Sequence, residues 1–463
     1  MKERLNRPTS QWVKFSIWSL IYILFIVWVG NFWWLLLLPL IFDVFITRFI
    51  PYDWWKKYKD TNPLVYTICS WIDAIVFALV AVYFIFLYLF QNYQIPSSSL
   101  EKSLLVGDFL FVSKATYGPR VPNTPLSFPL VQHTFPWGGK SYVEKPQWDY
   151  KRLKGLRQIE RGDIVVFNFP AGDTVAVRQP NPDYYTLCHY YGRDVVHARQ
   201  DLFGEVVWRP VDRRENYVKR CVGVPGDSLQ IVNNQIYVNQ TILEDKEDVQ
   251  YCYYVQTDGS VLTNKMFDKL GISKVDRILL NPSVDAGRKE LEAIGLNPSR
   301  PVYHLPLTRA MIAELEQMPQ VDTMVIEPDW RGGDVYPLGH TSWTRDNYGP
   351  IYMPKKGETL AITPGNYPIY ERVIRNYEGN SIQLQDSVVY INGEPASTYT
   401  FKMDYYFMMG DNRHQSADSR YWGLVPEDHI VGQPVFVWLS LNKDKGWLDG
   451  RIRWNRFLKP AGK

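Results

Sequence analysis

The sequence has little cysteine, little histidine and little net charge. Its 463 residues include four cysteines and seven histidines, and the formal net charge is +3, with acidic and basic residues interspersed. Nucleic-acid-binding proteins usually carry a basic patch or stripe, so this class is excluded and no nucleic-acid partner is expected. The cysteines lack the spacing of metal ligands and the histidines are scattered, so neither a metal ion nor an organic cofactor is expected.

The few cysteines leave one candidate disulfide. Cys69 lies in an apolar run and Cys221 lies in a strand-like motif. Cys188 and Cys252 therefore form the pair that any disulfide would join, and the sequence leaves open whether they are bonded.

Long apolar runs occupy residues 15–29, 32–47 and 65–90. A helix needs about 20 residues to cross a bilayer, so the third run is long enough, and "GNF" at 30–32 can join the shorter two as a hairpin. Basic residues at the outer ends of this hairpin, among them Lys14 and Lys56, place both ends in the cytoplasm. We expect a membrane anchor of about three helices in residues 1–91, with the rest of the chain on the far side. No short apolar stretch ends at a small-residue cleavage site, which argues against a cleaved signal peptide.

The remaining chain reads as mainly β with one helical interruption. Short alternating strands punctuated by turn residues predict a β core in residues 92–244 and 346–440, and the segments 228–241 and 381–395 read as two similar hairpins. Between them, "VDAGRKELEAIGL" and "LTRAMIAELEQM" have helical spacing, and Thr308 can cap the second helix. Residues 245–345 are therefore expected to form an inserted α/β lobe. We expect a surface excursion at 171–215 and a C-terminal tail at 441–463.

Three blocks carry the candidate chemistry: "IPSSSLEKSLLVGDF" at 95–109, "RGDIVVFNFP" with "NYVKRCVGVPGDSL" at 161–170 and 216–229, and "MMGDNRHQSADSRYWGLVPEDHIVGQPVFVW" at 408–438. In their order and in their distance from the last apolar run, these blocks resemble the bacterial type I signal peptidases. The resemblance implies a membrane-anchored, mainly β fold with a signal-peptidase-like domain. The lobe and the first two apolar runs lie outside the family motifs.

A serine that cleaves amides needs a base, because a free serine hydroxyl is a weak nucleophile. No histidine falls within the first two blocks, so a lysine is the remaining base. Its pKa must fall from about 10.4 toward about 7–8, which burial can achieve. Lys219 meets this demand on the strand-like "YVKRCVGV", where Arg220 alternates to the opposite face and can reach solvent or a carboxylate.

The resemblance assigns roles to further residues. It implies that Ser99 is the nucleophile, that Ser97 and the Ser99 backbone N–H bind the oxyanion, and that Ser98 has no role. It also implies that Ser416 hydrogen-bonds and orients the lysine, and that an ion pair of Asp418 and Arg420 supports the site. The positions that match the shallow apolar pockets for the substrate are Tyr93, Ile95, Pro96, Leu100, Leu104, Tyr217 and Val218. For Leu104, part of the role is expected to be core packing.

Four residues depart from the usual family pattern besides Leu100, which replaces a common Met. Lys102 and Ser103 replace a common Pro-Thr, and His414 and Gln415 replace a common Asp-Asn. The first change is expected to loosen the turn after the nucleophile. The second is expected to remove a negative charge near Arg413.

These observations predict a serine endopeptidase that removes signal peptides after small residues, anchored in a bacterial inner membrane with its catalytic domain on the periplasmic side. The expected partners are the signal peptides of secretory preproteins, the lipid bilayer and the protein translocation machinery. The sequence leaves open whether the lobe recognises a subset of substrates, contacts the translocation machinery or the cell wall, or only enlarges the core. Two alternatives stay open: a catalytically silent membrane scaffold and a self-cleaving Ser-Lys regulator. The apolar runs argue against the second, which would be soluble and would carry DNA-binding elements.

Overall fold

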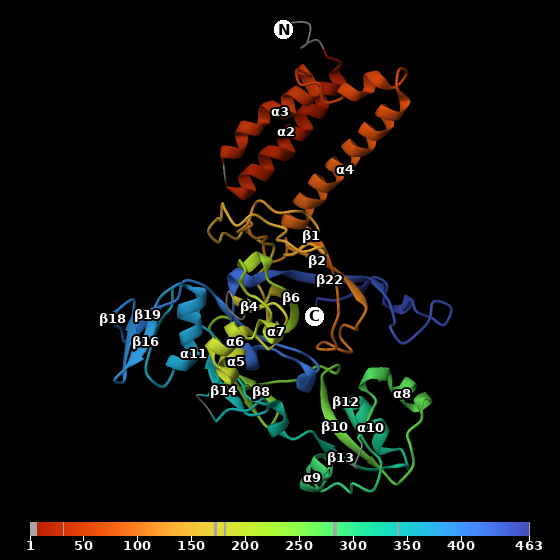
Figure 1. Ribbon diagram of the computed structural model, residues 1–463, viewed down its shortest axis with the longest axis vertical. Helices are drawn as coiled ribbons and strands as arrows, with labels where there is room; N and C mark the ends of the chain where they lie inside the picture. Colours follow the sequence, from red (N-terminus) through yellow and green to blue (C-terminus); the bar gives the residue numbers. More distant parts are fainter. Residues whose placement is uncertain are drawn as a thin grey trace.

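The computed structural model describes residues 7–30, 32–170, 174–179, 182–280, 285–339 and 342–462. Figure 1 shows three regions along the longest axis of the molecule. The N-terminal helices lie at one end, strands from distant parts of the sequence lie in the middle, and the lobe built on residues 250–326 lies at the other end. The lobe is therefore separated from the apolar helices by the β core.

Two N-terminal helices are long and apolar enough to cross a membrane: α2 (Thr9–Val29) and α4 (Pro63–Tyr88). In the most apolar stretch of α4 no residue is buried inside the protein, and Trp71 and Phe77 are 67% and 74% exposed. The core helix of a soluble protein would cover such side chains, so a lipid environment fits α4 better. The Asn62 side chain accepts a hydrogen bond from the Val65 backbone N–H and thereby caps the start of α4.

The second apolar run forms a shorter helix, Phe32–Thr47, which packs against α2. It consists of the 3-10 turn η1 (Phe32–Leu37), α3 (Leu38–Phe42) and the π-helical turn η2 (Asp43–Thr47). Asp43 accepts hydrogen bonds from the backbone N–H groups of Phe49 and Ile50, so it closes the end of this helix. The helix is shorter than the about 20 residues that span a bilayer, and the number of membrane crossings stays a prediction.

The central sheet has eight strands drawn from the whole length of the chain. In order across the sheet they are β1 (Phe90–Gln94), β2 (Asp108–Ser113), β22 (Ile430–Ser440), β3 (Ile164–Asn168), β6 (Asn216–Gly223), β20 (Tyr405–Met409) and β21 (Val425–Pro426), with β23 (Lys459–Pro460) paired to β22. The long strand β22 pairs with β3 through residues 430–432 and with β2 through 433–440. This switch of partners joins the two halves of the sheet. It brings the three sequence blocks together.

Two hairpins in the β core share one type of turn. The first joins β7 (Ser228–Val232) to β8 (Gln235–Val238), and the second joins β16 (Ile382–Gln385) to β17 (Val388–Ile391). Both two-residue turns have positive φ at both positions, Asn233–Asn234 and Asp386–Ser387. Such turns match the right-handed twist of the strands. The prediction of two similar hairpins is confirmed.

The hairpins extend into small sheets that flank the central one. In the first sheet, β9 (Thr241–Leu243) and β14 (Tyr348–Tyr352) pair with the hairpin of β7 and β8. In the second, β18 (Glu394–Pro395) pairs with β17. A separate two-stranded sheet consists of β15 (Thr359–Ala361) and β19 (Thr398–Thr400). α11 (Tyr367–Arg372) and the π-helical turn η7 (Val373–Tyr377) precede β16. Their apolar side chains share one core with β7, β8, β14 and β20.

The lobe has its own four-stranded sheet. The strand order is β11 (Ile278–Leu279), β12 (Val302–Thr308), β10 (Gln250–Thr257) and β13 (Val321–Ile326). The helices are α8 (Asn264–Leu270), α9 (Asp285–Ala293) and α10 (Arg309–Glu316), and Thr308 caps α10 as the sequence predicts. One cluster of buried apolar residues includes Phe267 and Leu315, and a second includes Tyr254 and Leu291. The lobe is thus packed on both faces of its sheet.

The segment expected as a surface excursion is folded. It contains β4 (Thr174–Ala176), α5 (Tyr184–Tyr191), α6 (Arg193–Ala198), α7 (Gln200–Phe203) and β5 (Val206–Trp208). A small core that includes Leu187 and Val196 holds these elements together. Its Pro and Tyr content concealed this packing from a sequence reading.

The candidate disulfide is wrong. Cys188 and Cys252 are free thiols, as are the other two cysteines. Cys188 lies half-buried in α5, whereas Cys252 is buried in β10 of the lobe, so the two belong to different folded units.

Candidate active site

The serine triplet lies in a loop between β1 and β2 that is closed by backbone hydrogen bonds. Ile95 N donates to Asp108 O at 2.9 Å, and Gly107 N donates to Ile95 O at 3.0 Å. Within the loop, Leu104 N donates to Leu100 O at 2.8 Å, which forms one helical turn directly after Ser99. Ser99 is 6% exposed, while Ser97 is exposed. The loop therefore holds one serine inside the protein and one at its surface.

Lys219 reaches Ser99 from the middle of the central sheet. It lies on β6, opposite Val165 of β3, and is 3% exposed. Its Nζ donates a hydrogen bond to Ser99 Oγ at 2.6 Å. Burial lowers the pKa of Lys219 to about 8, although the charges of Asp418 and Asp411 act in the opposite direction. The amine is therefore neutral in an appreciable fraction of molecules near neutral pH, and a neutral amine can accept the hydroxyl proton.

Arg220, the next residue on β6, is buried against a carboxylate. Its Nε and Nη2 donate to the two oxygens of Asp411 at 2.7 and 2.6 Å. Ser103 Oγ also donates to Asp411 Oδ2 at 2.6 Å. Burial alone would raise the pKa of the Asp411 carboxyl, but the hydrogen bonds and charge of Arg220 lower it. The expectation that Arg220 reaches a carboxylate is confirmed, and Ser103 joins this pair.

Asn412 connects the loop between β1 and β2, which carries Ser99, to the segment after β20. Its backbone N–H donates to Ser99 O at 3.1 Å, and its Nδ2 donates to Ser98 O at 3.3 Å. Sequence reasoning did not predict these contacts. They hold the carbonyl groups of Ser98 and Ser99, and thus the backbone on both sides of the Ser99 Cα.

Gly410 allows the two segments to approach. A Cβ at this position would lie 2.2 Å from Ser416 Oγ and 2.5 Å from Ser99 O. Both distances are shorter than the contacts that Cβ atoms make in proteins, so only glycine fits here without displacing the loop that carries Ser99.

Asp418 and Arg420 form the expected ion pair beneath this segment. Arg420 Nε and Nη2 donate to the two carboxylate oxygens of Asp418, each at 2.9 Å, and both residues are buried. Gly410 N donates to the same carboxylate at 3.2 Å. Burial opposes ionisation of Asp418, but the charge and hydrogen bonds of Arg420 hold its pKa below the ordinary value. The ion pair thus positions the segment that contacts Ser99.

Ser416 does not make the expected hydrogen bond to Lys219. Its Oγ is buried and has no hydrogen-bond partner among the described residues. The hydroxyl instead lies against Gly410, where it leaves no room for a side chain. Orientation of the amine is provided by the Ser99 hydroxyl, and the Tyr217 ring centroid lies 5.7 Å from Nζ.

The predicted substrate residues divide between core and surface. Ile95, Leu100 and Leu104 are fully buried in one apolar cluster, so they shape the site from behind. Tyr93 and Val218 are partly buried at the edge of that cluster. The two other candidates are Pro96, which is exposed, and Tyr217, which stacks on Phe169 at 4.6 Å between ring centroids.

Two cavities border these residues. One of about 320 Å³ is lined by Tyr93 together with Phe86 and Leu87 of α4. Another of about 370 Å³ is lined by Phe169 and Trp422, neighbours of Tyr217, and by Ser416. The first lies next to the end of the apolar helix, where a chain that leaves the membrane would pass.

The departures from the family pattern lie where the lobe contacts the site. Lys102 does not loosen its turn, because its Nζ donates to Gly271 O at the end of α8, at 2.7 Å. Its φ of 74° is one that proline cannot adopt. These facts correct the expectation of a looser turn.

The second pair of departures also faces the lobe. The negative charge near Arg413 is not lost, because Asp245 lies 2.8 Å from the Arg413 guanidinium. Cys252 N donates to His414 Nδ1 at 3.3 Å, and Gln250 N donates to Asp411 O at 2.9 Å. Strand β10 therefore docks directly on the segment that holds Ser99.

A serine hydroxyl becomes a better nucleophile when an adjacent base can take its proton. A buried amine of lowered pKa that is hydrogen-bonded to the hydroxyl can act as such a base. The family model "Signal peptidase, peptidase S26" matches residues 68–273 and 398–439, which is more than half of the chain. The match includes the loop of Ser99, strand β6 and the segment after β20. The chain therefore belongs to the signal peptidase family, peptidase S26, and is by this membership a peptidase.

Curated relatives agree with the family match. The chain is 23% identical over 376 residues to Signal peptidase I of Buchnera aphidicola subsp. Acyrthosiphon pisum, covering 81% of this chain and 76% of the relative. It is 22% identical over 413 residues to Signal peptidase I of Helicobacter pylori, covering 86% and 93%. The Haemophilus influenzae enzyme of the same name is 24% identical over 388 residues, covering 82% and 72%.

Proposed function

We propose that this protein is a membrane-anchored endopeptidase that removes signal peptides from exported proteins, with Ser99 as nucleophile and Lys219 as general base. The observation that carries the proposal is the 2.6 Å hydrogen bond between Lys219 Nζ and Ser99 Oγ around a buried amine. Family membership and the names of the relatives support the substrate class.

The proposed reaction has two halves with one shared base. Neutral Lys219 takes the proton of Ser99 as Oγ attacks the scissile carbonyl carbon. The resulting oxyanion accepts hydrogen bonds from the Ser99 N–H and from the exposed Ser97 hydroxyl, and such a donor is worth about 2.7–4 kcal/mol of the barrier. Lys219 then gives its proton to the leaving amine, which leaves an acyl ester on Ser99. In the second half Lys219 removes a proton from water, and the hydroxide attacks the ester carbonyl carbon. Lys219 then gives this proton to Ser99 Oγ as the ester C–O bond breaks, and the carboxylic acid product leaves and ionises in solvent.

The anchor supports the same proposal. The first β strand begins two residues after α4 ends at Tyr88, and Ser99 follows in the next loop. The nucleophile is thus tied close to the end of a helix of membrane-spanning length. A signal peptide held in the same bilayer would present its cleavage site nearby, which lowers the entropic cost of encounter. We place the β core and lobe on the periplasmic side of a bacterial inner membrane, with the lobe facing away from the bilayer.

Preprotein cleavage by purified variants tests the proposal. Ser99→Ala and Lys219→Met are expected to lower kcat/KM by at least about 10³-fold, because each removes a member of a pair that acts as one unit. Ser98→Ala is the matched control, since the backbone carbonyl of Ser98 accepts hydrogen bonds from Asn412 and Glu101 and the substitution keeps this carbonyl. Mass spectrometry of the wild-type protein during turnover is expected to find the acyl ester on the peptide that contains Ser99.

The outcomes separate the alternatives. Undiminished cleavage by either variant would contradict the Ser-Lys mechanism. Absence of cleavage by the folded wild-type protein would favour a catalytically silent scaffold. Cleavage of the chain itself without cleavage of preproteins would favour the self-cleaving regulator.

A further inference from the structure

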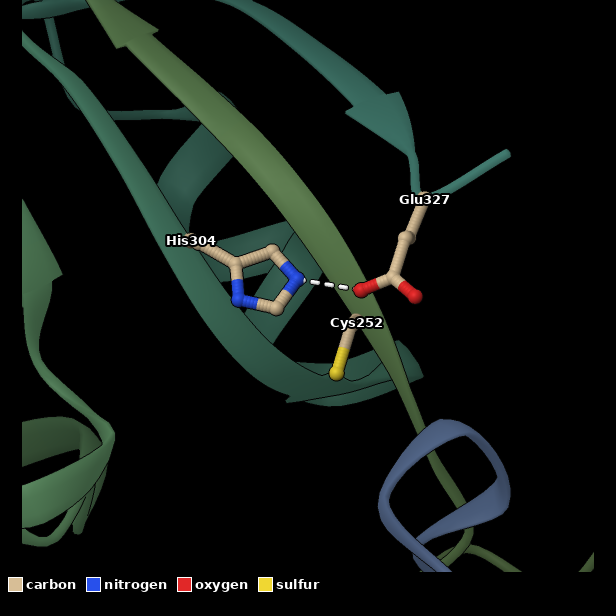
Figure 2. A group of neighbouring side chains, drawn as sticks. All are labelled: Cys252, His304 and Glu327. Atoms are coloured by element: carbon tan, nitrogen blue, oxygen red, sulfur yellow. Dashed lines mark hydrogen bonds and ion pairs between the residues drawn. The ribbon is translucent and has the colours of Figure 1, made fainter. Parts of the chain in front are cut away.

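Three side chains with metal-binding atoms meet in the lobe, at its end next to the β core. They are Cys252 on β10, His304 on β12 and Glu327 directly after β13 (Figure 2). One ligand atom of each lies within 4.8 Å of the others, and Cys252 and Glu327 are buried. In a tetrahedral site with bonds of about 2.0–2.3 Å, ligand atoms lie about 3.3–3.6 Å apart. Small side-chain rotations would therefore bring all three onto one ion.

The register of the lobe sheet puts these residues on one face. His304 pairs with Tyr254, and Cys252 lies two residues before Tyr254 on the same strand, so both side chains point to the same side. Glu327 N donates to Cys252 O at 2.8 Å, which fixes the third residue beside the first. Two strands contribute one ligand each, and the third ligand is the residue directly after β13, held to β10 by this backbone hydrogen bond.

The carboxylate is held in a suitable orientation. Arg345 Nη1 donates to Glu327 Oε1 at 2.7 Å, and the other oxygen, Oε2, contacts His304 Nε2. One oxygen of the Glu327 carboxylate is therefore fixed by Arg345, and the other is directed at the histidine. Metal ligands are commonly fixed by outer hydrogen bonds of this kind.

The charges around the cluster leave room for a cation. Asp346 lies 3.4 Å from the Arg345 guanidinium and 3.2 Å from His414 Nε2. Two carboxylates, Glu327 and Asp346, therefore share the one guanidinium of Arg345. The carboxylate oxygen of Glu327 that faces His304 is not the one that Arg345 contacts.

We propose that Cys252, His304 and Glu327 bind one zinc ion that ties together three segments of the lobe where it docks on the catalytic β core. Thiolate, imidazole and carboxylate are the ligand types that zinc uses in proteins. Water is the fourth ligand. Binding replaces the contact between His304 and Glu327, moves the imidazole hydrogen to Nδ1 and releases the thiol proton of Cys252 to solvent.

The consequence lies at the active site, although the ion does not take part in the reaction. Cys252 N donates to His414 Nδ1, and Gln250 on the same strand donates to Asp411 O. A metal that fixes β10 would therefore restrict the motion of the segment after β20. Asn412 of this segment hydrogen-bonds the backbone of Ser98 and Ser99.

Metal titration of the full-length protein in detergent tests the site. The protein, without any affinity tag, is stripped with a chelator and titrated with Zn²⁺ against a chromogenic competitor. One tight site per chain is expected. A thiol loses its proton when it binds zinc, so zinc binding at pH 7 should release protons, and Cys252→Ser should release fewer. Co²⁺ in place of zinc should give the near-ultraviolet absorption of a cobalt–thiolate bond.

Matched variants identify the ligands. Cys252→Ser and His304→Gln are expected to weaken zinc binding by at least about tenfold. Cys188→Ser, which removes a free thiol in α5, is the control and should bind as tightly as wild type. Sub-stoichiometric zinc, a cobalt spectrum without the thiolate band, or unchanged binding by Cys252→Ser would overturn the proposal. The wild-type spectrum decides the case even if a variant does not fold.

Discussion

The lowered pKa of Lys219 predicts a specific pH profile for cleavage. With a pKa of about 8, roughly a tenth of the amine is neutral at pH 7 and roughly nine tenths at pH 9. If the neutral amine is the base, kcat/KM should rise about tenfold between these pH values and then level off. A solvated lysine near about 10.4 would provide several hundred-fold less base at pH 7, so burial contributes about 3 kcal/mol to activation.

The perturbation that tests the cause is Asp418→Asn. The Asp418 charge stabilises the ammonium form and raises the pKa of Lys219, so its removal should move the acid limb of the profile below pH 8. The matched control is Asp227→Asn, which removes another buried carboxylate paired with an arginine, here Arg161 at 2.8 Å. Both changes leave an arginine without its charge partner, and only the first removes a charge that acts on Lys219.

The assay is kcat/KM for a fluorogenic signal-peptide substrate from pH 6 to pH 10 in detergent, with folding checked by circular dichroism at each pH. A wild-type acid limb near pH 10 would refute the effect of burial. An acid limb that moves to higher pH in Asp418→Asn would refute the assigned electrostatic cause. The same shift in Asp418→Asn and in the control Asp227→Asn would also refute it.

Three other perturbations have expected outcomes of their own. Between pH about 8 and about 10.5 the unfolded chain holds a proton that folded Lys219 has lost, so this residue should make the free energy of unfolding rise with pH by up to about 3 kcal/mol. Lys219→Met should remove this part of the rise in denaturant titrations, while the part due to buried Lys114, whose pKa is lowered to about 7, remains. Gly410→Ala should cost about 1–3 kcal/mol of stability and most of the activity, because its Cβ would meet Ser416 Oγ at 2.2 Å. Lys102→Ala removes the hydrogen bond to Gly271 O and should lower kcat/KM by up to about tenfold while hydrogen exchange in α8 increases.

Each of these has a control elsewhere in the chain. Gly365→Ala should be harmless, because a Cβ there meets only Thr363 Oγ1 at 3.8 Å. Lys265 is exposed on α8. Lys265→Met is the control for Lys219→Met and should keep the rise of the free energy of unfolding with pH. Lys265→Ala is the control for Lys102→Ala and should leave hydrogen exchange in α8 unchanged. Equal effects of test and control variants would show that the contacts named here are not responsible.

The sequence was sufficient for features that depend on local pattern. Alternating strands, tight hairpins and the Thr308 cap follow from residue type and spacing, and the structure contains them. Strand alternation indicated that Lys219 could be buried, and the resemblance to a known family supplied Ser99 as its partner. The ion pair of Asp418 and Arg420 was likewise expected from that resemblance.

Contacts between distant segments were not accessible. The cluster of Cys252, His304 and Glu327 has intervals of 52 and 23 residues, and only the register of the lobe sheet brings its members together. The hydroxyl of Ser416 failed as a predicted partner of the lysine because its direction depends on how closely Gly410 approaches Ser99. The compact unit at 174–208 was missed because its helices are too short for a periodic signal.

The departures from the family motifs are best explained by the lobe. Considered alone, Lys102 and His414 would weaken the site, because one replaces a rigid proline and the other an acid. In the structure each contacts the lobe, through Gly271 O and Cys252 N, and Asp245 of the neighbouring segment supplies a carboxylate to Arg413. The change at Lys102, in the loop that carries Ser99, and the change at His414, in the segment after β20, thus share one structural cause. A lobe that docks on the catalytic segments themselves can change the geometry of Ser99 without touching a substrate, so its stability and the activity of the peptidase should be coupled.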